Sequence, residues 1–100
     1  MSGGHFNYKQ YEIGYIADEI EHLIETNNSE EKDEWGDRKG YGFTPETISR
    51  FEMAVLYLKL AQIYVQRIDW LVSADDGEDS FHARLERELI DLVNQRNKNV

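Results

Sequence analysis

Residues 44–73 read TPETISRFEMAVLYLKLAQIYVQRIDWLVS, a stretch that has no glycine and only one proline, at its second position. Thr44 is a good helix N-cap. Pro45 and Glu46 suit the first helical turn, where a backbone N–H is not needed and a carboxylate meets the positive end of the helix dipole. Apolar residues then recur three and four residues apart, which predicts one continuous helix. At 1.5 Å per residue, this helix would be about 45 Å long.

The apolar residues of this stretch form two stripes that run side by side. The first stripe contains Ile48, Phe51, Val55, Leu58, Ala61, Val65, Ile68, Leu71 and Val72, and the second contains Met53, Leu56, Tyr57, Leu60, Tyr64 and Trp70. A helix with two apolar faces has to be covered from two sides, and a helix this long exceeds the width of a 100-residue domain. We therefore expect an all-α fold, a three-helix arrangement around one long central helix, which forms an oligomer through the excess face.

The rest of the chain supplies two shorter helices and three less regular segments of a single domain, residues 1–100. Helical spacing of apolar residues predicts a first helix over about Tyr8–Thr26 and a last helix that begins near Asp79 or Ser80. Residues 1–7 are expected to form an arm, residues 27–43 an acidic, glycine-containing loop, and residues 94–100 a frayed tail. Three aromatic residues of the loop predict that parts of it dock onto the helices: Trp35, Tyr41 and Phe43.

The chain carries a net charge of −9 and has no cysteine. An acidic chain is repelled by nucleic-acid backbones and by anionic lipid, so we expect no direct nucleic-acid binding and no membrane association. No apolar stretch approaches the length of a membrane span, and the start of the chain lacks the basic and apolar regions of a signal peptide. With the absence of cysteine, which fits a reducing compartment, these features predict a cytoplasmic protein.

One candidate binding cluster lies near the end of the long helix. Tyr64, Arg67 and Trp70 follow one another at intervals of one turn, and a phenol, a guanidinium and an indole can together stack on a base and hold a phosphate or carboxylate. The same residue types are also common anchors of a subunit interface, in which Arg67 would pair with a carboxylate from the acidic turn Asp75–Asp79. Both interpretations remain open. We add His82, at the start of the last helix, to the candidate binding residues.

The N-terminal arm offers a second candidate contact. Gly3 and Gly4 would let the chain pass closely over another surface and carry His5 and Phe6 into a pocket there. The alternative is a disordered leader.

The acidic clusters do not match a metal site. Asp75–Asp79 lacks the ligand spacing of an EF-hand, since Ala83 falls where a bidentate glutamate is required. A helix cap in which Gly77 adopts a positive φ explains this turn better. Glu19 and His22 match half of a di-metal motif, but they flank the apolar Ile20 and Leu23 and look like solvated positions. We therefore expect no metal and no cofactor.

Paired carboxylates leave one enzymatic alternative. Helical nucleotide pyrophosphohydrolases hold magnesium with ExxE and ExxD pairs on facing helices, and Glu31-x-x-Glu34 and Glu88-x-x-Asp91 have these spacings. The first pair lies in the loop, so the two pairs are not predicted to converge on one magnesium ion. The chain also lacks a recognisable nucleophile motif and a glycine-rich phosphate loop, and we expect it not to be an enzyme.

Five short segments carry a resemblance: Ser2-Gly3-Gly4-His5-Phe6, Tyr8-x-x-Tyr11, Arg67-Ile68-Asp69-Trp70-Leu71, Asp75-Asp76-Gly77-Glu78 and Phe81-His82. Together they resemble a set of short proteins of unknown function that are encoded by bacteriophages and by bacteria with phage-derived genes. The resemblance covers nearly the whole chain. It implies a small accessory protein that acts in the host cytoplasm, where phage proteins of this size often inhibit a host factor or sequester a small signal molecule.

We therefore expect a small non-enzymatic binding protein of phage type, a homo-oligomer that inhibits or sequesters a host protein or a small anionic molecule. One alternative is an acidic nucleic-acid mimic that blocks a DNA-binding host enzyme, and another is a magnesium-dependent nucleotide pyrophosphohydrolase. The expected binding residues are Tyr64, Arg67, Trp70, His82, His5 and Phe6, with no catalytic and no metal-binding residue among them.

Overall fold

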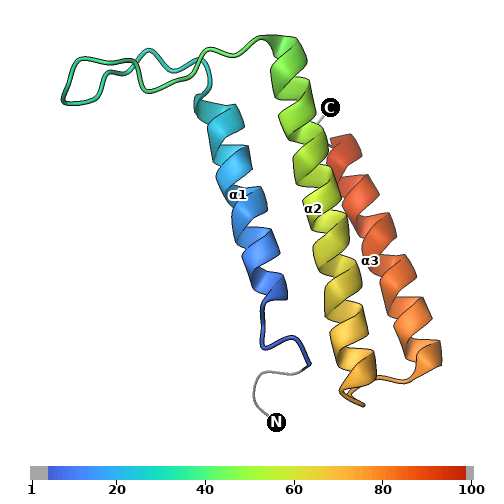
Figure 1. The fold of residues 1–100 in the computed structure, drawn as a ribbon. Helices are drawn as coiled ribbons and strands as arrows, with labels where there is room; N and C mark the ends of the chain where they lie inside the picture. Colours follow the sequence, from blue (N-terminus) through green and yellow to red (C-terminus); the bar gives the residue numbers. More distant parts are fainter. Residues whose placement is uncertain (1–4, 99–100) are drawn as a thin grey trace.

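A computed structural model describes residues 5–98, which form three helices joined by two connections (Figure 1). The helices are α1 (Gln10–Thr26), α2 (Pro45–Val72) and α3 (Glu78–Lys98). The prediction of an all-α chain with three helices is confirmed, and residues 5–98 contain no strand, only an isolated bridge between Lys32 and Arg38. Residues 1–4 of the expected arm and residues 99–100 of the expected tail lie outside the described part.

The three helices lie beside one another in a single layer (Figure 1). α2 packs against α1 and against α3, whereas α1 and α3 do not contact each other within residues 5–98. The Cα radius of gyration is 17.5 Å, against about 13 Å for a compact domain of 100 residues. The accessible surface is 7639 Å², roughly 1,700 Å² more than a compact monomer of this mass exposes. The chain therefore leaves far more surface uncovered than its size requires.

The apolar core between the helices is small. Among the described residues, the buried apolar side chains are one from each helix, Ala17, Val55 and Leu92. α1 and α2 come close at Gly14, where an added Cβ would lie 2.7 Å from the Gln62 Oε1 atom. Because so few apolar side chains are fully buried, much of the apolar circumference of α2 is covered by neither flanking helix.

The start of α2 follows the predicted capping pattern. The Thr44 hydroxyl accepts a hydrogen bond from the Thr47 N–H at 3.3 Å, Pro45 occupies the first turn, and Glu46 is the acidic residue of that turn. The Thr44 hydroxyl satisfies one N–H group that has no partner inside the helix, and Pro45 has no N–H to satisfy. α2 then runs without interruption for 28 residues.

The end of α2 differs from the prediction in which residue makes the cap. Ala74 adopts a left-handed conformation with φ of 63°, whereas Gly77, which we expected to do so, does not. The Asp75 N–H donates to the Trp70 carbonyl at 2.9 Å and the Ala74 N–H donates to the Leu71 carbonyl at 3.2 Å. These two bonds form a Schellman motif, in which the left-handed position falls directly after the C-cap and therefore three residues before Gly77.

The start of α1 is later than predicted. Asn7 and Tyr8 have positive φ angles of 54° and 63°, so Tyr8 cannot belong to a right-handed helix and α1 begins at Gln10. The left-handed pair turns the chain sharply, and residues 5–9 form a turn closed by the Lys9 N–H and the Phe6 carbonyl at 3.0 Å. The sequence predicted helical spacing through Tyr8 because the turn has no glycine or proline to mark it.

The other two boundaries also shift. α3 begins at Glu78, because the Gly77 carbonyl already accepts the first helical bond, from Phe81, at 2.8 Å. At the other end α3 continues to Lys98, so residues 94–98 form its last turns. No helix of the described residues is long and apolar enough to cross a membrane.

Replacing Ala74 by glycine tests the helix cap. The left-handed conformation costs an alanine about 1 kcal/mol more than a glycine, so Ala74→Gly should raise the free energy of unfolding by about that amount, measured by urea denaturation. Ala83→Gly, at an exposed position inside α3, is the matched control and should lower it by about 1 kcal/mol. Equal destabilisation by both variants would contradict the left-handed assignment of Ala74.

Candidate binding site

The candidate residues from the long helix and the arm gather at the C-terminal end of α2. Tyr64, Arg67 and Trp70 lie in its last three turns, and the backbone of His5 and Phe6 reaches the same end by hydrogen bonds to Asp69. His82 lies one turn into α3. In Figure 1 the start of α1, the end of α2 and the start of α3 share one end of the layer.

Arg67 is held inside the protein, with only 6% of its surface exposed. Its Nε atom lies 2.9 Å from the Glu88 Oε1 atom on α3, but the N–H does not point along this line and forms no aligned hydrogen bond. Its guanidinium also lies 4.1 Å from the centre of the Trp70 ring. The carboxylate that pairs with Arg67 therefore comes from α3 and not from the acidic turn, to which the subunit-interface interpretation assigned it.

Tyr64 and His82 lie on the surface. Tyr64 is 44% exposed on α2. His82 is also exposed, and its ring meets that of Phe81 edge to face at 5.1 Å. The structure thus brings Arg67 and Trp70 into direct contact but shows no contact that joins His82 to them. A buried, paired guanidinium is poorly placed to receive an anionic ligand unless Glu88 moves away.

Asp69 is a buried carboxylate that sequence reasoning did not include among the binding residues. Its Oδ1 atom accepts hydrogen bonds from the His5 N–H at 2.6 Å and the Phe6 N–H at 3.2 Å, and its Oδ2 atom accepts one from the Gln10 side chain at 3.3 Å. Gln10 also donates to Gln66 at 2.8 Å, which leaves its own Oε1 atom without a partner. These bonds fasten the start of the chain to α2. The signal in the sequence for this role was that Asp69 is a single acid between the apolar Ile68 and Trp70.

The acidic turn after α2 forms a weak contact with α3. The Asp76 side chain is buried, and its Oδ1 atom lies 3.8 Å from the Arg84 Nη1 atom.

Among the described residues, no group of three or more His, Asp or Glu side chains converges in a way that could hold a metal ion.

A continuous apolar stripe on α2 is covered by neither flanking helix. Its members are spaced three or four residues apart and are all exposed: Tyr57, Ala61, Tyr64, Ile68 and Val72. Residues with this spacing share one face of a helix, and Tyr57 is 62% exposed. We call these five residues the exposed stripe. An apolar strip of this length is unusual on a protein that works alone.

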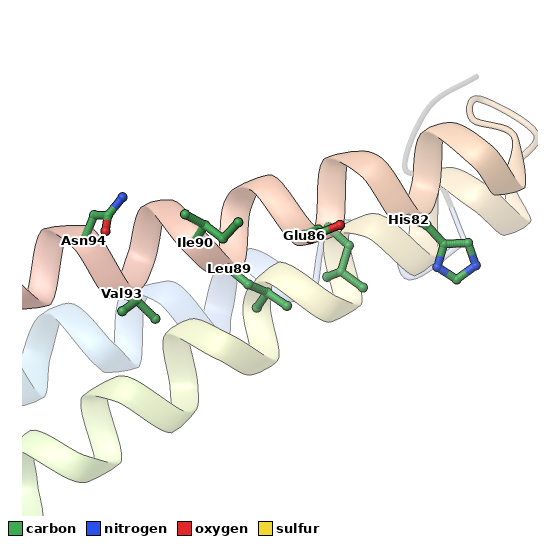
Figure 2. A pocket seen from close by; sticks show the side chains of 7 residues that line it. His82, Glu86, Leu89, Ile90, Val93 and Asn94 are labelled. Carbon is green, nitrogen blue, oxygen red and sulfur yellow. The ribbon is translucent and has the colours of Figure 1, made fainter.

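The apolar surface continues from the exposed stripe onto α3. A groove of about 490 Å³ runs along α3, and Figure 2 shows Leu89 and Val93 on its wall, with His82 at one end and Asn94 at the other. The Arg96 Nη2 atom lies 3.9 Å from the Met53 Sδ atom. Arg96 lies about one turn after Val93 of the groove, and Met53 lies one turn before Tyr57 of the exposed stripe. Their contact therefore places the groove on α3 and the exposed stripe on α2 next to each other, on the same side of the layer.

The loop between α1 and α2 is an ordered hairpin that projects away from the helices (Figure 1). The Asp33 carboxylate accepts hydrogen bonds from the Trp35 N–H at 2.9 Å and the Asp37 N–H at 3.0 Å. The Lys39 N–H donates to the Glu31 carbonyl at 2.8 Å. Trp35, at the tip, is 79% exposed and does not dock onto the helices. We call residues 29–41 the hairpin finger.

The base of the hairpin finger is fixed to α1 and α2. The buried Asn27 side chain accepts from the Phe43 N–H at 2.8 Å and donates to the Phe43 carbonyl at 3.0 Å. The Phe43 ring packs edge to face on Phe51 of α2 and stacks on Tyr41. Gly40 is buried there, where an added Cβ would lie within 2.7 Å of three backbone carbonyl oxygens. Phe43 thus docks as expected, with Tyr41 against it.

No family model, curated protein or solved structure matches the chain.

Replacing Asp69 tests the anchor at the start of the chain. Asp69→Ala removes the acceptor of two backbone N–H groups and of one N–H of the buried Gln10 amide, so the free energy of unfolding should fall by about 3 kcal/mol, measured by urea denaturation. Asp69→Asn should cost less, because its oxygen still accepts both N–H groups and Gln10 can turn its unpaired oxygen towards the new amide. The control is Asp91→Ala on the exposed side of α3.

Hydrogen exchange gives the second readout of this anchor. The His5 and Phe6 amides should exchange faster in Asp69→Ala than in the natural chain and the Asp91→Ala control. Unchanged protection of both amides, with unchanged stability, would contradict the anchoring role of Asp69.

Proposed function

We propose that this chain is a non-enzymatic binding protein of phage type, whose contact with a host protein is the hairpin finger and whose helices form a homo-oligomer around α2. The observation that carries the proposal is Trp35, which lies 79% exposed at the tip of an ordered hairpin. An exposed tryptophan in the middle of a contact surface is the residue type that most often dominates protein–protein binding.

The internal bonding of the hairpin finger supports this role. Asp33 fixes the tip through the N–H groups of Trp35 and Asp37, and the Arg38 Nε atom donates to the Ser29 carbonyl at 2.9 Å. A segment that is already ordered before it binds loses less conformational entropy on binding. The finger also stands clear of the helices (Figure 1), and most of the surface of Trp35 at its tip is open to a partner.

The charges around Trp35 favour a protein partner over the other targets considered. Five acids and three bases lie within residues 29–41, and Lys39 lies 3.9 Å from Glu31. A nucleic-acid mimic would present a more uniform row of negative charge. A small anionic molecule would need a free cation at the end of α2, where Arg67 is buried against Glu88. A pocket with an apolar floor and a basic rim would fit this finger.

Capture of a partner from a bacterial host lysate by the natural chain and by Trp35→Ala tests the proposal. The substitution should reduce the amount of the specific partner at least about tenfold, as expected for the loss of a binding hot spot. Tyr15→Ala is the matched control, because Tyr15 is 66% exposed on α1 and lies outside the finger. Equal capture by both variants would contradict the proposed contact.

Charge reversal of Glu30 and Glu34 tests whether the acidic side chains of the hairpin finger contact the partner. Glu30→Lys with Glu34→Lys should slow association and make it less sensitive to salt, because rim charges act mainly on the association rate. Asp33 is left unchanged, since its carboxylate holds the tip. The association rate is measured by surface plasmon resonance against the captured partner. An unchanged rate would show that Glu30 and Glu34 lie outside the interface.

A further inference from the structure

Four of the five residues of the exposed stripe belong to a regular heptad pattern, and Val72 lies outside it. Ala54, Ala61 and Ile68 are seven residues apart, and so are Tyr57, Tyr64 and Leu71. These two sets alternate at spacings of three and four, the pattern of the a and d positions of a coiled coil. We call these six residues the seam. Four of the six are exposed, and Ala54 and Leu71 are half-buried, so the pattern lies on the side of α2 that α1 and α3 leave open.

We propose that a second copy of this chain covers the seam, with the two α2 helices antiparallel and a two-fold axis between Ala61 and Tyr64. This inference deepens the proposed homo-oligomer and rests on it, but it is independent of the target of the hairpin finger.

Side-chain size selects the antiparallel register. With the axis between Ala61 and Tyr64, Ala61 of one copy faces Tyr64 of the other, and Ala54 faces Leu71. Each small residue then meets a large one, which is the condition for close packing. In a parallel pair, each position would face its own copy, so that alanines would oppose alanines and leave gaps while tyrosines would oppose tyrosines. A two-fold interface has to be self-complementary. The seam meets this condition when the two α2 helices are antiparallel, because its small residues then face its large ones.

Charge favours the same register. Arg50 is exposed seven residues before Tyr57, and Asp75 is exposed seven residues after Ile68, in the acidic turn. The antiparallel register brings Arg50 of each copy opposite the acidic turn of the other. A parallel pair would bring Arg50 against Arg50 and one acidic turn against the other, and like charges at close range oppose association.

The area available is sufficient for a stable pair. The chain exposes roughly 1,700 Å² more than a compact monomer of its mass, and a stable interface hides about 800 Å² on each partner. A strip along α2 about 40 Å long and 20 Å wide, including the adjoining face of α3, supplies that amount. The hydroxyl groups of Tyr57 and Tyr64 can remain at the wet margin while their rings are covered.

Cysteine cross-linking tests the register, because the natural chain has no cysteine and each introduced thiol is unique. With a short bismaleimide, Ala61→Cys should link to its own copy, since the two positions lie about 5 Å apart along the axis. Ile68→Cys alone should not, since its two copies lie about 16 Å apart along the axis. A mixture of Tyr57→Cys with Ile68→Cys should link. Linking of Ile68→Cys to itself as readily as Ala61→Cys would overturn the antiparallel assignment.

The oligomeric state is measured in parallel by sedimentation equilibrium. Ala61→Arg should raise the dissociation constant about 100-fold, because two charges enter one apolar seam. Ala83→Arg, at an exposed alanine of α3, should leave it unchanged, and circular dichroism checks that both variants remain helical. A natural chain that stays at 11.8 kDa at millimolar concentration would overturn the proposal, as would dissociation by Ala83→Arg alone.

The same variants keep this inference separate from the finger. Capture of a host partner that persists in Ala61→Arg, with the dimer lost as predicted, would support both proposals. If the cross-linked dimer forms as predicted but Trp35→Ala does not reduce capture of the partner, only the proposed role of the hairpin finger is contradicted.

Discussion

The constraint on which the rest of the structure depends is that α2 carries apolar side chains around its whole circumference. One helix of 28 residues packed between two others in a single layer cannot bury all of these side chains, since each neighbour covers only one side. The small core, the excess accessible surface and the exposed stripe all follow from this geometry. A bundle of three helices that each touched the other two would cover more, but here α1 and α3 do not meet within the described residues.

Polar contacts fix the ends of this layer because apolar contacts there are few. Asp69 holds the start of the chain against α2, Arg67 joins α2 to Glu88 of α3, and Asn27 holds the base of the hairpin finger. Each of these side chains is buried, and each binds groups from a segment distant in sequence. Large aromatic side chains remain exposed to a partner, among them Trp35 on the finger and Tyr57 on α2. This division separates the side chains that maintain the fold from those available for binding.

The sequence predicted the parts of the fold that depend on periodicity and capping, and it was less successful where the backbone leaves the helical conformation. α2 was predicted to within a residue at each end because Thr44, Pro45 and a long apolar repeat define it. Left-handed Tyr8 and Ala74 were missed, since neither is a residue type that marks such a position. Of the candidate site, Arg67 and Trp70 were correctly placed near each other, but a buried partner such as Glu88 is selected by packing across 21 residues, which no local pattern records. The sequence did not reveal that Trp35 is the exposed aromatic residue of the loop and Phe43 the docked one, because that choice depends on how the loop folds back on itself.

Hydroxyl-radical footprinting measures most directly whether α2 is covered in the working protein, because one molecule contains both the test residues and their control. Tyr57 and Tyr64 are 62% and 44% exposed in the single chain, and Tyr15 on α1 is 66% exposed. If a second copy covers the seam, Tyr57 and Tyr64 should be strongly protected from oxidation while Tyr15 reacts freely. Reactivity of all three tyrosines in proportion to these exposures, at concentrations where the protein is active, would contradict a covered α2.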